Sequence, residues 1–346
     1  MRGKNRQENK NMKKNKISVC IPFYNIESYV SRCLDSILNN TYKNIEVICV
    51  NDASTDSTLK ILRKYEERDS RVIIIDKKTN EGLPSARNSA LDRCTGDFIA
   101  IIDGDDWIHK QYFEVLLNIQ EKTKADVVCC DNKICSEYET DDKIELTSLQ
   151  VECFGLEKLM DKWNIKSRIW GRIYSKEIIN QKRLPCDVTM GEDTLYNLSV
   201  LCSKNDVKIA SIDAKLYYYF NRENSIVHTV SHGNIVALSF NFLKNIEDFS
   251  KKGKKVILLQ ALNSMFAYRY LEKYNNNNEI KCNCKKLYKL CTKNWNDTEG
   301  LSIRKKMEYR VLYYFPIIYR LMRIIKDPTM LNWEREQRKS IRRKKN

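Results

Sequence analysis

The feature that most restricts the fold of this chain is an alternation of short, apolar runs with amphipathic stretches over its first 135 residues. Five β-branched runs predict strands, at residues 17–22, 45–50, 71–75, 98–102 and 126–130. The stretch after the first run places Ile26, Tyr29, Val30, Cys33 and Ile37 on one helical face, and further helices are expected near 84–93 and 110–122. Apolar strands that alternate with helices predict an α/β fold, with a mostly parallel sheet covered by helices on both faces.

Polar side chains follow three of these runs at the point where each run ends. Tyr24 and Asn25 follow the first, Asn51 and Asp52 the second, and Asp103, Asp105 and Asp106 the fourth. Parallel sheets bind ligands at the carboxyl ends of their strands, so these residues are expected to meet at one rim. Turn and helix-cap chemistry would account for Asp52 alone, but not for carboxylates after two separate strands. Clustered carboxylates repel one another, which predicts a bound cation or ligand among them.

The chain carries a formal net charge of +16 at pH 7, which favours an anionic partner. Much of the positive charge lies at the two ends, in residues 2–16 and 338–346, and simple solvation of these ends is the alternative interpretation. Residues 1–15 are expected to be a basic, disordered tail. The charge is not accompanied by an RNA-binding aromatic signature or a helix-turn-helix pattern, so no nucleic-acid partner is expected.

The sequence favours a cytoplasmic location. Residues 1–16 lack the apolar core of a secretory signal, and no uninterrupted apolar run approaches the length of a transmembrane helix. The cysteines number 13, without a CxxC pair, and several lie inside apolar runs such as ISVCIP and DVVCC. We expect buried free thiols in a reducing compartment. Cys282, Cys284 and Cys291 lack the ordinary spacing of structural zinc ligands.

Five motifs occur in order along residues 16–230. They are VCIPFYN at the first strand, VNDASTDST at the second, NEGLPSARNSAL at 80–91, DGDDW at 103–107 and GEDTLYN at 191–197. On these motifs the chain resembles the family 2 glycosyltransferases, inverting enzymes with an A-type, Rossmann-like fold. The resemblance implies a nucleotide-sugar-binding and catalytic domain over 16–230, followed by a helical, basic region over 231–346.

The family pattern implies a donor site made of residues that follow the strands. Tyr24 and Asp52 would contact the nucleotide base, typically uracil. Asp103 would contact the ribose, and Asp105 would bind a Mg²⁺ or Mn²⁺ ion that bridges the diphosphate. The same resemblance adds further donor contacts at Pro22, Asn25, Arg87 and Gly104.

Later motifs supply the catalytic segment in this resemblance. Asp193 would be the base, with Glu192 beside it, and capping of a helix is the alternative role for Asp193. Trp170 and Arg172, in a W-x-R-x-Y segment, would shape the donor pocket. In the segment RENSIVH, Arg222 and His228 would reach the diphosphate or the metal, and a surface or packing role is the alternative for His228.

The resemblance implies transfer of a hexose or N-acetylhexosamine from a nucleotide-diphosphate donor, with UDP the expected carrier. The acceptor would be a hydroxyl of a glycan or lipid-linked glycan, in the synthesis of a bacterial cell-surface polysaccharide. The metal would neutralise the leaving diphosphate, and the base would take the acceptor proton during attack on the anomeric carbon. The QxxRW motif and the transmembrane helices of processive members are missing, which argues against polymerisation through a membrane channel.

Two other classes of protein are alternatives. A haloacid-dehalogenase-like phosphatase also places Asp-x-Asp after an apolar strand, but near the start of the chain and without a following Asp-Trp pair such as Asp106 and Trp107. A catalytically degenerate, membrane-associated binding module would keep the fold, although Asp105 and Asp193 are both retained here. The transferase would release nucleoside diphosphate, the phosphatase inorganic phosphate, and the binding module neither.

The segment 303–326 mixes aromatic and aliphatic residues with Arg and Lys, and Pro316 interrupts its apolar centre. Such a segment could lie on an anionic membrane surface without spanning it, which predicts a peripheral association with the inner face of the plasma membrane. A packing helix of a second lobe is the alternative.

Overall fold

The computed structural model describes residues 15–139, 149–159, 161–162, 165, 167–186, 191–222, 249–261, 278–293 and 303–314. The chain forms two compact units, Met1–Ser231 and His232–Asn346. All five motifs lie in the first unit. His228, the predicted tail before Asn15 and the basic residues after Tyr314 lie outside the described residues.

The first four strands form a parallel half-sheet, as the apolar runs predicted. Strand β1 (Ile17–Phe23) pairs with β2 (Ile45–Asn51) on one side and with β4 (Phe98–Ile101) on the other. Strand β3 (Val72–Asp76) lies beyond β2, giving the order β3-β2-β1-β4. Every residue of β1, β2 and β4 is buried. Strands with two buried faces need apolar residues at consecutive positions, which explains the uninterrupted runs in the sequence.

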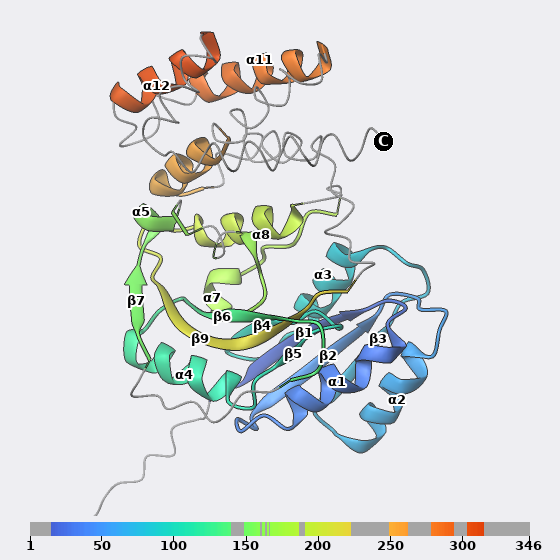
Figure 1. Ribbon diagram of the computed structural model, residues 1–346. Coiled ribbons are helices and arrows are strands. Elements are labelled where there is room, and N and C mark those ends of the chain that lie inside the picture. Colours follow the sequence, from blue (N-terminus) through green and yellow to red (C-terminus); the bar gives the residue numbers. More distant parts are fainter. Residues whose placement is uncertain are drawn as a thin grey trace, which may run out of the picture. The chain divides into compact units, whose positions relative to one another are not determined.

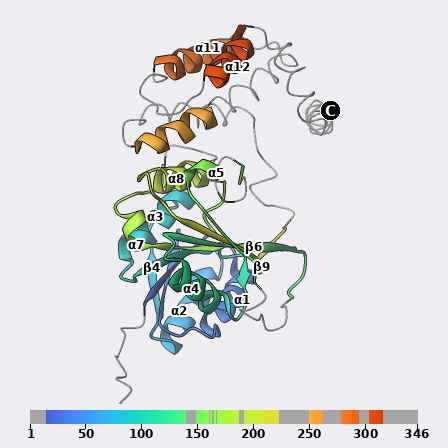
Figure 2. The same cartoon turned by 90° about the vertical axis from the view of Figure 1, so that its left-hand side faces the viewer.

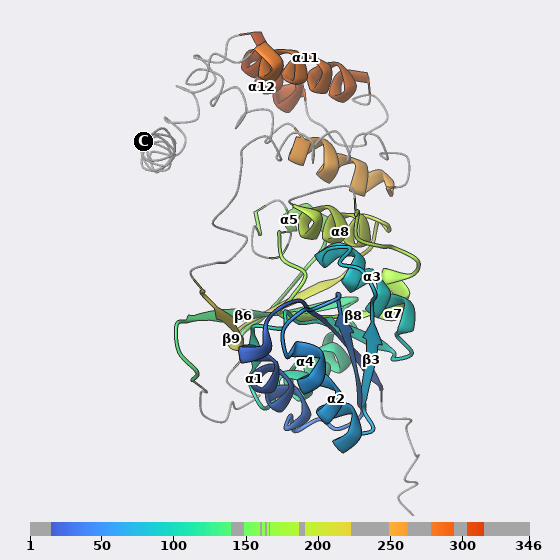
Figure 3. The same cartoon turned by 90° about the vertical axis from the view of Figure 1, so that its right-hand side faces the viewer.

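Helices cover both faces of the sheet. Figures 1, 2 and 3 show α1 (Glu27–Leu38), α2 (Thr58–Arg68) and α4 (Tyr112–Thr123) on one face, with α3 (Leu83–Arg93) on the other. The predicted apolar face of α1 is confirmed, since Val30, Cys33 and Ile37 are buried in the same core cluster as β1. Helices α3 and α4 match the two ranges predicted from the sequence to within two residues.

The other half of the sheet is mixed and was only partly predicted. It contains β5 (Trp107–Ile108), β6 (Val127–Cys135), β7 (Val151–Phe154), β8 (Arg172–Ser175) and β9 (Ile209–Phe220). The strand order continues β4-β8-β6-β9-β5, with β7 also on β9. Strand β8 is antiparallel to β4 and β6, whereas β6 and β9 are parallel. The expected α/β class with a parallel sheet and flanking helices is confirmed, and antiparallel strands extend it.

Two short helices and one longer helix complete the described part of the first unit. They are α5 (Leu156–Leu159), α7 (Lys176–Ile179) and α8 (Glu192–Leu201). Helix α8 begins where GEDTLYN predicted a helix start. Gly191 precedes it with φ of 81°, a left-handed conformation that glycine adopts without strain.

The described segments of the second unit are helical, as predicted. They are residues 251–261, α11 (Asn278–Lys293) and α12 (Ile303–Tyr314). On α11, Cys282 is exposed and Cys291 is buried, and no group of three potential metal ligands occurs among the described residues. The described stretches also contain no helix that is both long and apolar enough to cross a lipid bilayer.

Candidate functional site

The loop after β4 packs directly against the end of β1. A Cβ atom added to Gly104 would lie 2.7 Å from both the Pro22 carbonyl oxygen and the Phe23 ring, so only glycine fits this position. Pro22 and Gly104, both expected at the donor site, are therefore neighbours. This contact brings the acidic residues after β4 to the rim formed by the ends of β1 and β2.

Asp52 connects β2 to the motif NEGLPSARNSAL. Its carboxylate accepts hydrogen bonds from the backbone N–H groups of Glu81 and Gly82, at 3.1 and 2.8 Å, and lies 3.3 Å from the Lys77 ammonium. The Asp52 residue is 2% exposed. Asp52 thus orders the loop that leads into α3, a role beyond the turn chemistry of its own segment.

Tyr24 and Asn25 lie at the same rim, after β1. Asn25 has a φ of 49°, and its side-chain oxygen accepts a hydrogen bond from the Thr55 backbone N–H at 2.8 Å. This bond joins the loops that follow β1 and β2. The Tyr24 ring is 46% exposed, so it is available to stack on a planar ligand.

The three aspartates of DGDDW have different surroundings. Asp106 is buried, and its carboxylate accepts hydrogen bonds from the Tyr217 hydroxyl at 2.6 Å and the Phe220 backbone N–H at 2.8 Å. The Tyr217 hydroxyl in turn accepts a hydrogen bond from the Asp103 backbone N–H at 3.2 Å. Asp106 therefore attaches β9 to the acidic loop. Burial and the nearby Asp103 and Asp105 raise the pKa of Asp106 well above its ordinary value.

Asp105 carries the carboxylate that pairs with Arg222. The Arg222 Nε atom lies 2.9 Å from an Asp105 carboxylate oxygen, and the Arg32 guanidinium donates to the Asp105 backbone carbonyl at 2.6 Å. Burial and the charge of Asp103 raise the pKa of Asp105, whereas Arg222 and Arg32 oppose the rise. A carboxylate that is expensive to ionise in this position is suited to a cationic partner.

Arg87, on α3, joins the acidic loop to the start of α8. Its guanidinium donates to the Asp103 carboxylate at 2.6 Å and to the Asp193 carboxylate at 2.7 Å, and Glu192 lies 3.8 Å away. The Arg87 side chain is 2% exposed. Two carboxylates that are distant in the sequence are therefore held by one buried cation.

Asp193 is a partly buried carboxyl, with its side chain 21% exposed, and its pKa is perturbed. Burial raises the pKa of Asp193 to about 7; Glu192 and Asp103 add to the rise, and Arg87 and Arg172 oppose it. Helix α8 has no side-chain capping hydrogen bond, so Asp193 does not cap the helix, in contrast to the alternative considered from the sequence. A carboxyl that titrates near neutral pH is suited to accept a proton.

Trp170 and Arg172 mainly contact other parts of the protein and lie outside the acidic cluster. The Trp170 ring stacks on Tyr217 and Tyr219 of β9, with centroids 4.6 and 5.7 Å apart. Arg172 is 2% exposed and donates to the Ile165 backbone carbonyl at 2.7 Å. Both residues line a pocket of about 600 Å³ with Asp131, Lys162 and Asp213, but Asp103, Asp105 and Asp193 do not line it.

Two residues of the site were not predicted from the sequence. The Arg32 guanidinium lies 4.3 Å from the centres of both the Trp107 and Phe220 rings, which fixes the backbone of the acidic loop. Tyr217 positions Asp103 and Asp106, and nothing in its run of three tyrosines indicates this role. Trp107 is fully buried and stacks on Tyr218, so it packs the acidic loop against β9.

The sequence is similar to those of known glycosyltransferases. The chain is 33% identical over 223 residues to glycosyltransferase GlyA of Streptococcus pneumoniae, covering 61% of this chain and 31% of GlyA. It is 30% identical over 217 residues to the uncharacterized glycosyltransferase EpsJ of Bacillus subtilis, covering 61% of this chain and 62% of EpsJ. The similarity thus spans less than two thirds of the length of either relative.

Similarity to solved structures supports the fold. The structure of S. aureus TarS 1–349 in complex with UDP-GlcNAc aligns with a TM-score of 0.64 and 22% identity, covering 80% of this chain and 81% of that chain. The family model for Glycosyl transferase family 2 matches residues 18–201, which is more than half of the chain and includes all five motifs. This chain therefore belongs to glycosyl transferase family 2.

Proposed function

We propose that the protein is an inverting glycosyltransferase that moves a sugar from a UDP-linked donor to a hydroxyl group of a glycan or lipid-linked glycan. The observation that carries this proposal is the bridge from Asp103 through Arg87 to Asp193. It places the carboxylate expected at the donor ribose and the carboxylate expected to act as base on one guanidinium. Donor binding and proton removal would then occur side by side.

The donor half of the proposal rests on the rim formed by β1, β2 and β4. Tyr24 offers an exposed aromatic face for a base, and Asp52 lies at the end of the neighbouring strand. TarS, which shares the fold, was solved with UDP-GlcNAc, so we propose a UDP-linked hexose or N-acetylhexosamine as donor. The same proposal places this transfer in the synthesis of a bacterial cell-surface polysaccharide.

The residues present fit a Mg²⁺ or Mn²⁺ ion at Asp105. Its carboxylate oxygens are the hard ligands that both ions prefer. Burial and the charge of Asp103 raise its pKa although Arg222 and Arg32 oppose the rise, so a bound cation would favour its ionised form. A single protein carboxylate leaves coordination positions for diphosphate oxygens. When bound, the ion would neutralise charge on the leaving diphosphate. Arg222, which pairs with Asp105, is positioned to contact the same diphosphate.

The catalytic half rests on Asp193. Its pKa of about 7 lets it be ionised in a large fraction of molecules at neutral pH and still bind the acceptor proton well. One base and one in-line displacement at the anomeric carbon would invert its configuration. Glu192, the next residue on α8, lies 3.8 Å from the same guanidinium and would contribute negative charge rather than a second base.

Ligand-induced stabilisation tests the donor half. A ligand at about 100 times its Kd stabilises the native state by about 2.7 kcal/mol. We expect UDP-GlcNAc or another UDP-sugar with Mn²⁺ to raise the melting temperature and to release UDP during turnover. Asp105→Asn should lose the metal-dependent rise, whereas Asp92→Asn, at an exposed carboxylate on α3, should keep it.

Undiminished turnover of Asp105→Asn, or undiminished turnover of the wild-type protein in excess EDTA, contradicts the metal assignment. Release of inorganic phosphate instead of UDP would favour the phosphatase alternative.

We also propose that the second unit contacts an anionic membrane surface through α12. Ile303 is 82% exposed and Met307 is 51% exposed, one helical turn apart, and Arg304 lies beside them with an 80% exposed side chain. An exposed apolar pair next to a cation suits the headgroup region of a membrane.

Co-sedimentation with phosphatidylglycerol vesicles should weaken in the double variant Ile303→Ser and Met307→Ser. The matched variant Ile134→Ser, at an exposed position of β6, should bind as wild type does; equal binding of all three proteins contradicts membrane docking.

A further inference from the structure

We propose that Arg87 is a positioning residue for the base, which holds Asp193 in one orientation and favours its ionised form. This inference rests on the proposed function and changes the role expected for Arg87, which the motif SARN suggested to be a contact to the donor. The structure favours the new role because the guanidinium of Arg87 faces protein carboxylates.

The hydrogen-bonding capacity of Arg87 is directed at these carboxylates. One terminal nitrogen donates to Asp103, and the other donates to Asp193. The nitrogen that donates to Asp193 also lies 3.8 Å from a carboxylate oxygen of Glu192. The remaining Nε atom is buried and has no hydrogen-bond partner. With a 2% exposed side chain, Arg87 offers little surface to a donor molecule. A planar guanidinium can hold two separate carboxylates in fixed directions, which a lysine ammonium cannot do as rigidly.

The three residues come from three different elements. Arg87 is in the middle of α3, Asp103 follows β4, and Asp193 is in the first turn of α8. Asp193 has no capping role in α8, so the bond to Arg87 fixes the direction of its carboxylate. Since the same guanidinium holds Asp103, the base keeps a constant position relative to the expected ribose site.

The charges around Asp193 determine what loss of Arg87 would do. Glu192 from α8 and Asp103 from the β4 loop disfavour ionisation of Asp193, and burial adds to their effect. Arg87 from α3 and Arg172 from β8 favour ionisation. Arg172 is the more weakly acting of the two cations, because it donates to the Ile165 carbonyl rather than to Asp193. Without Arg87, the carboxyl group would stay protonated to higher pH.

The first test uses Arg87→Gln and Arg87→Lys with UDP-GlcNAc and Mn²⁺, and water as the acceptor. In Arg87→Gln, the acidic limb of the kcat profile should move up by about one to three pH units, the usual effect of a neighbouring opposite charge. At pH 7, kcat should fall by about 5- to 500-fold and recover as the pH is raised, while donor affinity by calorimetry is unchanged. Arg87→Lys should keep the limb near its wild-type position and still lower kcat, since the charge stays and the planar bridge between Asp103 and Asp193 is lost. Arg183→Gln, at a partly exposed ion pair with Asp92 of α3, is the matched control and should change neither quantity.

A second measurement needs no substrate. Carboxyl ¹³C NMR of aspartate-labelled protein, with the signal assigned by its loss in Asp193→Asn, gives the titration midpoint of Asp193 directly. The midpoint should rise in Arg87→Gln and stay near the wild-type value in Arg87→Lys. If Arg87→Gln does not fold, a changed carboxyl chemical shift in Arg87→Lys with the same midpoint supports the role.

Three outcomes overturn the inference. Weaker donor affinity with an unmoved pH limb would make Arg87 a donor contact, and an unmoved Asp193 midpoint in Arg87→Gln would show that Arg87 does not set its ionisation. An unchanged Asp193 chemical shift in Arg87→Lys would show that the guanidinium does not orient the Asp193 carboxylate. If the wild-type protein neither binds nor hydrolyses any UDP-sugar, the proposed function fails instead, and the NMR titration still decides the role of Arg87.

Discussion

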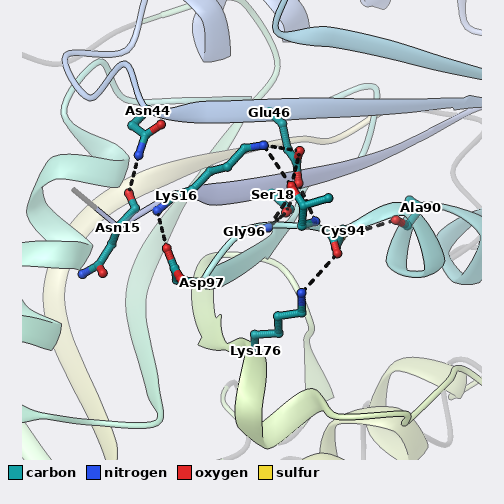
Figure 4. A network of polar contacts seen from close by, with 11 residues as sticks. Asn15, Lys16, Ser18, Asn44, Glu46, Ala90, Cys94, Gly96, Asp97 and Lys176 are labelled. Carbon is teal, nitrogen blue, oxygen red and sulfur yellow. Dashed lines mark hydrogen bonds and ion pairs between the residues drawn. The ribbon is translucent and has the colours of Figure 1, made fainter. Parts of the chain in front are cut away.

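Two groups of buried and partly buried carboxylates lie at opposite ends of the same parallel strands. At the amino end, Glu46 of β2 accepts hydrogen bonds from the Ser18 hydroxyl at 2.5 Å and from the Lys16 ammonium at 2.6 Å (Figure 4). It also accepts bonds from the backbone N–H and the hydroxyl of Thr95, at 2.7 and 2.8 Å. All these partners are donors, and both carboxylate oxygens are used. Although burial opposes ionisation, these bonds lower the pKa of Glu46 to about 2.

The carboxyl end is arranged in the opposite way. Asp105, Asp106 and Asp193 all have raised pKa values, because burial and mutual repulsion outweigh the bonds they accept. The arginines nearby, Arg32, Arg87, Arg172 and Arg222, compensate this charge only in part. A carboxylate whose partners are complete stabilises the fold, whereas a group of under-compensated carboxylates is kept for a ligand. The difference between the two ends thus separates structural charge from functional charge.

The largest effect is expected at the carboxyl end, from Asp193→Asn. Removal of a general base lowers the chemical rate by about 10² to 10⁴-fold. The amide should leave affinity for UDP-GlcNAc and Mn²⁺ unchanged, because Asp193 lies on the acceptor side of the proposed reaction. Single-turnover transfer beside calorimetry of donor binding measures both quantities. Asp206→Asn, at an exposed position, is the control and should transfer at the wild-type rate. Wild-type transfer by Asp193→Asn, or failure only through lost donor binding, contradicts the base assignment.

Only part of the site at the carboxyl end could be predicted from the sequence. The apolar runs identified β1 to β4, and the rule for parallel sheets brought Tyr24, Asp52 and Asp103 to one rim, because both depend on local pattern. The pair of Arg87 and Asp193 joins residues 106 positions apart, so no local pattern could reveal it. The buried settings of Trp170 and Arg172 depend on antiparallel strands whose sequences, such as RIYS, lack an uninterrupted apolar run.

The second effect is on stability, at the amino end. Glu46→Gln replaces one acceptor oxygen by an amide group that faces the donors Lys16 and Thr95. Hydrogen bonds to charged groups contribute about 1.5–3 kcal/mol, so the free energy of unfolding should fall by about that amount. Turnover per folded molecule should not change, since Glu46 is remote from the carboxyl rim. Urea unfolding followed by fluorescence measures the loss. Glu152→Gln, at an exposed carboxylate of β7, is the control and should cost less than Glu46→Gln, because water screens its ion pair with Lys162.

The third effect is the pH dependence of the stability that Glu46→Gln removes. The pKa of Glu46 is lowered to about 2 in the folded protein, so its contribution is complete above its unfolded pKa of about 4.5 and disappears as the pH falls towards 2. The difference between wild type and Glu46→Gln should therefore shrink between these values. Asp193 has the opposite sign, because its raised pKa lowers stability as the pH rises from about 4 to about 7. Urea unfolding at several pH values measures this change. If the difference in the free energy of unfolding between wild type and Glu46→Gln is the same at every pH, the proposed role of the ionised Glu46 is wrong.

The smallest effect is expected from Lys16→Met, which removes the cation at the amino end. The Lys16 side chain is 38% exposed, so water screens its ion pair with Glu46, and such pairs contribute about 0–1 kcal/mol. Glu46 keeps its bonds from Ser18, Thr95 and the Gly96 backbone N–H, and so remains compensated. By contrast, Arg87 is 2% exposed, and its loss would leave Asp103 and Asp193 without their shared partner. Urea unfolding of Lys16→Met and Arg87→Met compares the loss of the two cations directly. A loss in Lys16→Met as large as that in Glu46→Gln would show that the amino end depends on its cation, as the carboxyl end does.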